Sequence, residues 1–193
     1  MPSSSALPTA PAASHTARMD YLAKARRVFE IELTAAQRVA ARLDGAFGCA
    51  VEMIRASVEA RGKVVVLGVG KSGHIGEKIA ATLTSTGSPA VVLNSLNALH
   101  GDLGVVADGD VVLALSTSGE TDELLNVLPA LRRFEVRIIA LTGNPRSTLA
   151  LHSDVARDVS VEQEACPLQL APTSSTTAML VLGDALEIGR AHV

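Results

Sequence analysis

The first part of the chain carries apolar residues at intervals of three or four positions, the spacing of one face of an α-helix. The members are Leu22, Ala25, Phe29, Leu33, Ala36, Ala40, Leu43, Phe47, Val51 and Ile54. Glycines at positions 45 and 48 interrupt the series, and glycine weakens a helix interior. The sequence therefore predicts two N-terminal helices, over about residues 17–43 and 46–60.

Beyond residue 60 the pattern changes to short, continuous apolar runs separated by helically spaced residues. The runs occupy residues 64–67, 90–93, 111–115, 136–141 and, more weakly, 154–159. Continuous apolar strands are typical of a parallel sheet that helices cover on both faces. Between the strands the spacing predicts a helix over about 120–133, kinked at Pro129, and a last helix that begins near Ser174. The fold class is therefore α/β, with a doubly wound, mostly parallel sheet of about five strands.

Composition excludes several classes of partner. The net charge is −3 and aromatic residues make up 2% of the chain, so we expect neither nucleic acid nor a membrane surface as a partner. Cys49 and Cys166 form no C-x-x-C pair, which indicates a reducing compartment, and we expect a cytoplasmic protein. His15 and His152 lack ligand-like neighbours, so we expect no metal and no cofactor.

Residues 1–16 differ in composition from the rest of the chain. They are rich in Pro, Ser, Ala and Thr and lack the bulky apolar residues that offset ordering entropy. The stretch also lacks the basic start and apolar run of a secretory signal. We therefore predict a disordered tail over 1–16 and a single domain over 17–193.

A glycine-rich loop follows the first predicted strand, and ligands of doubly wound sheets bind at the carboxyl ends of strands. Gly68, Gly70 and Gly73 match G-x-G-x-x-G, but the second strand ends at Asn94 without the acidic residue that a dinucleotide site needs. A P-loop is excluded because position 65 is valine. What remains is an anion cradle that presents Gly70, Lys71 and Ser72, or a tight turn whose glycines serve packing.

The loop after the third strand carries four hydroxyls and a glycine before a helix. The hydroxyls belong to Ser116, Thr117, Ser118 and Thr121. Hydroxyls and free backbone N–H groups can bind a phosphate monoester without a cluster of arginines. The alternative is that Ser118 or Thr121 only caps the helix, which needs one such residue rather than four.

Five segments together resemble the sugar isomerase (SIS) domain family, and more narrowly its arabinose 5-phosphate isomerases of lipopolysaccharide and capsule biosynthesis. They are Gly68–His74, His100–Gly104, Ser116–Glu120, Glu164–Leu168 and Ala171–Thr177. The resemblance implies a flavodoxin-like SIS fold and an aldose–ketose isomerase that interconverts arabinose 5-phosphate and ribulose 5-phosphate. It also implies a homo-oligomer, usually a tetramer, with sites at subunit boundaries.

The resemblance also implies roles for individual residues. The family's phosphate-binding hydroxyls fall on Ser72, Ser116, Ser118 and Thr121, with Thr117 beside them. Its implicated lysine, histidine and acidic residues fall on Lys71, His100, Glu120 and Glu164. Thr173 and Ser174 open the last helix, where they cap it, reach the substrate, or do both.

The sequence departs from the family pattern in two places. Most members continue into a pair of cystathionine-β-synthase-type regulatory domains, and we expect a chain without that pair because the sequence ends at Val193. The histidine that members carry just after the last helix has no clear counterpart, since His192 stands in a different context. Asn97 occupies the place of a glutamate that usually precedes the His-Gly-Asp-Leu-Gly motif.

Isomerisation through an enediol needs a base, a donor near the carbonyl oxygen and a phosphate anchor. Glu164 is the candidate base, a partly buried carboxylate with its pKa raised toward neutrality, the alternative being a solvated loop carboxylate. His100 is expected to shuttle the proton or assist ring opening, or else to serve as a capping residue. Lys71 polarises the carbonyl or contacts the phosphate, and Glu120 is catalytic or, as we favour, holds its loop. Both cysteines are interpreted as small buried hydrophobes.

Three hypotheses about function remain open. The chain is an arabinose 5-phosphate isomerase, an SIS isomerase of another sugar phosphate, or a sugar-phosphate-binding regulatory module without turnover. Residues 1–60 show no basic recognition helix, so DNA binding is not expected.

Overall fold

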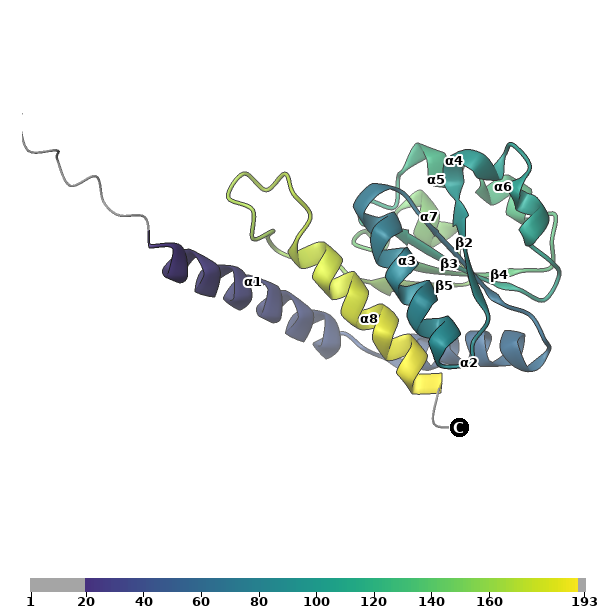
Figure 1. The fold of residues 1–193 in the computed structure, drawn as a ribbon, viewed down its shortest axis with the longest axis horizontal. Helices are drawn as coiled ribbons and strands as arrows, with labels where there is room; N and C mark the ends of the chain where they lie inside the picture. Colours follow the sequence, from purple (N-terminus) through teal and green to yellow (C-terminus); the bar gives the residue numbers. More distant parts are fainter. Residues whose placement is uncertain (1–19, 191–193) are drawn as a thin grey trace, which may run out of the picture.

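A five-stranded sheet forms the centre of the protein, as the computed structural model of residues 20–190 shows (Figure 1). Its strands are β1 (Val64–Gly68), β2 (Ala90–Asn94), β3 (Val111–Ser116), β4 (Arg137–Thr142) and β5 (Val155–Asp158). The order is β2-β1-β3-β4-β5, and every neighbouring pair is parallel. The predicted fold class is confirmed. The predicted tail over 1–16 and His192 lie outside the described residues.

Helices cover both faces of the sheet. One face packs against α2 (Gly45–Glu59), α3 (Gly70–Ser85) and α8 (Ser174–Arg190), as the buried cluster joining Ile54, Ile79 and Met179 to alternate strand residues shows. The other face packs against short helices, which are α4 (Ser95–Ala98), α5 (Asp122–Leu125), α6 (Leu128–Leu131) and α7 (Thr148–Leu151). Since successive strand residues point to opposite faces, both sets of side chains must be apolar, which explains the continuous apolar runs.

The single helix predicted over about 120–133 is wrong. The structure has two four-residue helices there, α5 and α6, separated by Asn126 and Val127. Pro129 lies in the first turn of α6, where it has no N–H to donate to Leu125, so a continuous helix would lose a hydrogen bond and place the proline ring against that carbonyl. The turns at α4, α7 and η1 (Asp102–Val105) are too short for periodicity to reveal.

The first helix, α1 (Tyr21–Ala41), extends beyond the sheet and packs along α8 (Figure 1). Asp20 caps it by accepting the Ala23 N–H, and its buried residues are Ala35 and Val39. Large apolar residues of the series noted in the sequence face solvent: Phe29 is 67% and Leu33 is 59% exposed. Within residues 20–190, no helix is long and apolar enough to cross a membrane.

Candidate active site

All predicted site residues lie at the carboxyl edge of the sheet. Ser116 is the last residue of β3, and the others lie in loops or helix starts. After β1 the chain turns sharply into α3. A Cβ atom on Gly68 would lie 3.0 Å from Gly73, and Gly70 has a positive φ of 58°. Neither the ammonium of Lys71 nor the hydroxyl of Ser72 bonds to another side chain or backbone group within 20–190. The glycines therefore close the turn, as the packing alternative requires, while the turn still presents Lys71 and Ser72 at the first turn of α3.

The loop from Ser116 to Thr121 folds on itself. Ser116 Oγ lies 2.8 Å from Thr121 Oγ1 and accepts the Gly119 N–H at 3.0 Å, and Ser118 Oγ accepts the Glu120 N–H at 3.1 Å. Thr121 makes no side-chain cap on α5. Because α5 is only four residues long, the strong helix terminus expected beside this loop is absent. The loop's anion-binding capacity rests on its hydroxyls and N–H groups.

Glu120 joins this loop to the next one. Its Oε1 accepts the Thr148 N–H at 2.7 Å, at the start of α7, and that bond lowers the pKa of the carboxyl. The next N–H of α7, that of Leu149, also donates to this loop, at 3.1 Å from Gly119 O. These two bonds tie the loop to α7, as expected if Glu120 holds its loop in place.

The segment between β5 and α8 presents Glu164. Its Oε2 accepts the Thr173 N–H at 2.7 Å, the Thr173 hydroxyl at 3.0 Å and the Ser175 N–H at 3.3 Å. Burial raises the pKa of Glu164, but the donors on Ser175 and Thr173 lower it by more and hold it below the ordinary glutamate value. The predicted shift toward neutrality is therefore wrong, because the start of α8 supplies hydrogen bonds that the sequence pattern does not reveal.

Gln169 is a residue of this segment that sequence reasoning missed. Its Oε1 accepts the Glu164 N–H at 2.8 Å, and its Nε2 donates to Glu164 O at 2.9 Å. Its backbone has a φ of 55°, a value that residues other than glycine rarely adopt. The side-chain amide of Gln169 thus bonds to both the N–H and the C=O of Glu164, and no sequence motif identifies Gln169.

The interpretation of both cysteines as buried hydrophobes is also wrong. Cys49 is exposed on α2, and Cys166 is half-buried. Backbone N–H groups of the turning segment, chiefly those of Ala171 and Leu170, lower the pKa of the Cys166 thiol. The thiol therefore has polar surroundings, which its apolar neighbours in sequence do not reveal.

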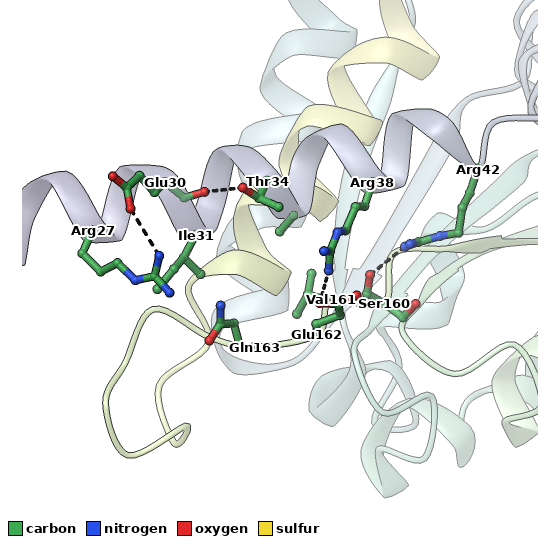
Figure 2. A pocket seen from close by; sticks show the side chains of 11 residues that line it. Arg27, Glu30, Ile31, Thr34, Arg38, Arg42, Ser160, Val161, Glu162 and Gln163 are labelled. Atoms are coloured by element: carbon green, nitrogen blue, oxygen red, sulfur yellow. Dashed lines mark hydrogen bonds and ion pairs between the residues drawn. The ribbon is translucent and has the colours of Figure 1, made fainter.

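Two hollows lie at this side of the molecule. One, of about 220 Å³, joins the loop after β3 to the segment after β5, and both Thr117 and Glu164 line it. The other, of about 460 Å³, lies between α1 and residues 160–163 (Figure 2). Each arginine that lines it forms an ion pair with a nearby carboxylate, as Arg38 does with Glu162, so the positive charges of this hollow are already balanced. Only the first hollow contains predicted site residues.

His100 lies apart from Glu164 in the topology. It is exposed in the turn after α4, where its N–H donates to Asn97 O at 2.9 Å. β2 and β5 are the two edges of the sheet, so the strands that precede these residues are separated by about 19 Å at four strand spacings. Within the described part of the chain, no three His, Cys, Asp or Glu side chains are grouped as a metal site.

The doubly wound parallel sheet, with hydroxyl-rich and glycine-rich loops at its carboxyl edge, places the chain among the α/β proteins, a class whose open sheets generally bind ligands at that edge. The SIS domain family model matches residues 58–188, and the chain belongs to this family.

The chain is also similar to individual proteins. It is 50% identical over 170 residues to "Arabinose 5-phosphate isomerase KdsD" of Pseudomonas aeruginosa, covering 88% of this chain and 51% of that protein. It is 48% identical over 161 residues to "Arabinose 5-phosphate isomerase GutQ" of Escherichia coli K12, covering 83% and 49%. The chain spans about half the length of these curated relatives. The solved structure of E. coli CFT073 c3406 in complex with arabinose 5-phosphate superposes with a TM-score of 0.85 at 38% identity, covering 90% of this chain and 91% of that one.

Proposed function

We propose that the protein is an arabinose 5-phosphate isomerase, which interconverts this aldose with ribulose 5-phosphate for lipopolysaccharide or capsule sugar synthesis in the cytoplasm. The observation that carries the proposal is the anchored Glu164 carboxylate, which lines one hollow with Thr117 of the hydroxyl loop. The similarity to c3406, which was solved with arabinose 5-phosphate and is matched over nearly its whole length, supports the choice of substrate.

In the proposed reaction the loop from Ser116 to Thr121, with Gly70 and Ser72, holds the phosphate. Glu164 removes the C2 proton of the open-chain aldose while a donor, Lys71 or His100, protonates the carbonyl oxygen to give the enediol. The proton then returns to C1 as the C2 hydroxyl loses its own. The oxidation of C2 balances the reduction of C1 within the same sugar, so the reaction needs no external redox partner. Phosphate binding far from the reacting carbons can hold them in place.

The function is tested by incubating the protein with arabinose 5-phosphate in deuterium oxide and following the sugar by NMR. We expect ribulose 5-phosphate to form with deuterium at the exchanging carbon, because the enediol exchanges its proton with solvent. Binding without exchange would instead support the regulatory module. Exchange confined to another sugar phosphate would support a different SIS isomerase, a candidate that Asn97 at a usual glutamate position favours.

We further propose that the protein is a homo-oligomer, with a tetramer favoured. The outward face of α1 carries a stripe of large exposed apolar residues between Tyr21 and Leu33, including Phe29, and a lone helix face of this kind is normally covered by a partner. Two further exposed apolar residues, Leu96 and Leu99, both more than half exposed, precede His100 in the segment after β2. The separation of β2 from β5 favours His100 serving the site of another copy.

Charging the stripe is expected to break the assembly. In Phe29→Glu/Leu33→Glu, two carboxylates occupy the apolar face, so the mass measured by light scattering after size exclusion should fall toward that of one chain. The matched control is Ala23→Glu/Ala41→Glu, which adds the same charges at exposed positions of α1 outside the stripe and should leave the mass unchanged. An unchanged mass in the first variant would contradict the proposed interface.

A further inference from the structure

The two oxygens of the Glu164 carboxylate have different surroundings. All three hydrogen bonds that the carboxylate accepts within residues 20–190 reach Oε2: two come from Thr173 and one from the Ser175 N–H. Oε1 accepts none of them. Oε2 is therefore the anchor of the carboxylate, which the Ser175 hydroxyl also stabilises in its ionised form, and Oε1 is the oxygen left for a group that enters the hollow shared with Thr117.

The direction of the Thr173 hydroxyl bond follows from its neighbours. Thr173 Oγ1 lies 2.8 Å from the Ala165 nitrogen, which can only donate, and 3.0 Å from Glu164 Oε2, which as a carboxylate can only accept. A hydroxyl has one proton, so Thr173 accepts from Ala165 and donates to Glu164. That proton is used inside the protein, so the hydroxyl has no second one to donate to a substrate.

We propose that Thr173 is a positioning residue of the isomerase: it fixes Oε2 of Glu164 and thereby aims Oε1 at the substrate as the atom that takes the C2 proton. The inference rests on the proposed function and differs from the alternative in which the Thr173 hydroxyl reaches the substrate. In the step, an Oε1 lone pair takes the proton, and the C2–H electrons form the C1=C2 bond of the enediol. The donor at the carbonyl oxygen supplies the balancing proton, and the reverse transfer at C1 restores Glu164.

The surroundings of Glu164 make this role testable by pH. Glu162 lines the same hollow and is paired with Arg38 of α1, and the Cys166 thiol lies two residues further along the loop. The first turn of α8 contributes only hydroxyls and N–H groups. The hydrogen bonds to Oε2 stabilise the ionised carboxylate, so removal of the Thr173 hydroxyl should raise the pKa of Glu164. It should also loosen the carboxylate, which would then be held mainly by the N–H groups of Thr173 and Ser175.

The experiment is a pH profile of kcat at saturating arabinose 5-phosphate, with KM measured alongside, in the wild type, Thr173→Val and Thr173→Ser; kcat is used because the free phosphate monoester itself titrates at about pH 6. We expect Thr173→Val to lower kcat by about 10²-fold, the cost of a small misplacement of a reacting group, with little change in KM. The acid limb of its pH profile, the range in which the rate falls as Glu164 is protonated, should move to higher pH. Thr173→Ser, which keeps the hydroxyl, should restore both the wild-type kcat and the wild-type acid limb. Thr173→Ala removes the same hydroxyl without adding a methyl and replaces the valine variant if that protein does not fold.

Gln169→Gly separates this effect from general loosening of the loop. Glycine accepts the positive φ, and the variant loses the bonds to the Glu164 main chain but keeps every donor to Oε2. It should lower kcat without moving the acid limb. A Thr173→Val enzyme with the wild-type acid limb and only a raised KM would overturn the inference and make Thr173 a substrate contact. A wild-type protein that does not isomerise arabinose 5-phosphate would overturn the proposed function and this inference with it.

Discussion

Replacing Glu164 with glutamine is expected to stop proton exchange at C2 while arabinose 5-phosphate still binds. The amide oxygen of the introduced side chain can accept the bonds that Oε2 accepts from Thr173 and Ser175, so the segment before α8 should keep its shape. The amide has no lone pair of comparable basicity to take a carbon-bound proton. Loss of a general base costs about 10²–10⁴-fold in rate, so exchange should fall by at least that lower factor.

The measurement is deuterium incorporation by NMR, with sugar-phosphate affinity measured by calorimetry in parallel. Glu120→Gln is the matched control, since it removes a second carboxylate at the same edge of the sheet, one bonded to the Thr148 N–H. If Glu120 holds its loop, this variant should weaken binding and leave proton exchange within about tenfold of wild type, well short of the loss of a base. Exchange that survives Glu164→Gln but not Glu120→Gln would reverse the two assignments.

The lowered pKa of Glu164 adds a dependence on pH. A base acts only when ionised, and this carboxylate is ionised above its pKa, which the donors of Ser175 and Thr173 hold below the ordinary value. At saturating substrate, kcat should therefore persist as the pH falls to about 4.3, the pKa of an unperturbed glutamate, provided that the protein remains folded. The measurement is made in kcat because a free phosphate monoester itself titrates at about pH 6 and would shape kcat/KM. An acid limb of kcat near neutrality in the wild type would contradict the hydrogen-bonded state of Glu164.

The strands could be predicted because each must be apolar on both faces, and that requirement is local in sequence. The length of the helix expected over 120–133 could not be predicted in the same way, because it depends on a single residue. Pro129 divides that helix into α5 and α6. The same limit applies to chemistry. Glu164 follows from its motif, but its pKa depends on donors nine and eleven residues away that only the fold brings to Oε2.

The anchor of the Glu164 main chain illustrates a further limit. Gln169 has no periodic or motif context, and its contribution depends on a backbone conformation that is rare for glutamine. The apolar series of α1 shows the same limit, because periodicity identifies a helix face without identifying what covers it, and this face is exposed in the single chain. Contacts within a loop and the environment of a helix face are thus two features that the sequence pattern alone does not reveal.

Gly119→Ala is expected to destabilise the protein strongly and to abolish sugar-phosphate binding. Gly119 has a φ of 68°, and a left-handed conformation costs an L-residue about 1–2 kcal/mol. The added Cβ would also overlap the side chain of Ser147 and lie 2.8 Å from Thr142 Oγ1. Overpacking of this kind costs about 1–3 kcal/mol more, so we expect a total loss of about 2–5 kcal/mol.

The matched control for the glycine variant is Gly109→Ala. Gly109 also has a positive φ, 87°, but a Cβ there meets nothing within 4 Å, so only the backbone cost of about 1–2 kcal/mol applies. Urea unfolding of both variants measures the difference, which isolates the close approach of Gly119 to Ser147. That approach holds the hydroxyl loop against the start of α7, so a loop displaced by the methyl group cannot keep Ser116 and Thr121 in bonding contact. Equal losses of stability in the two variants, with binding retained in Gly119→Ala, would show that the loop does not depend on this contact.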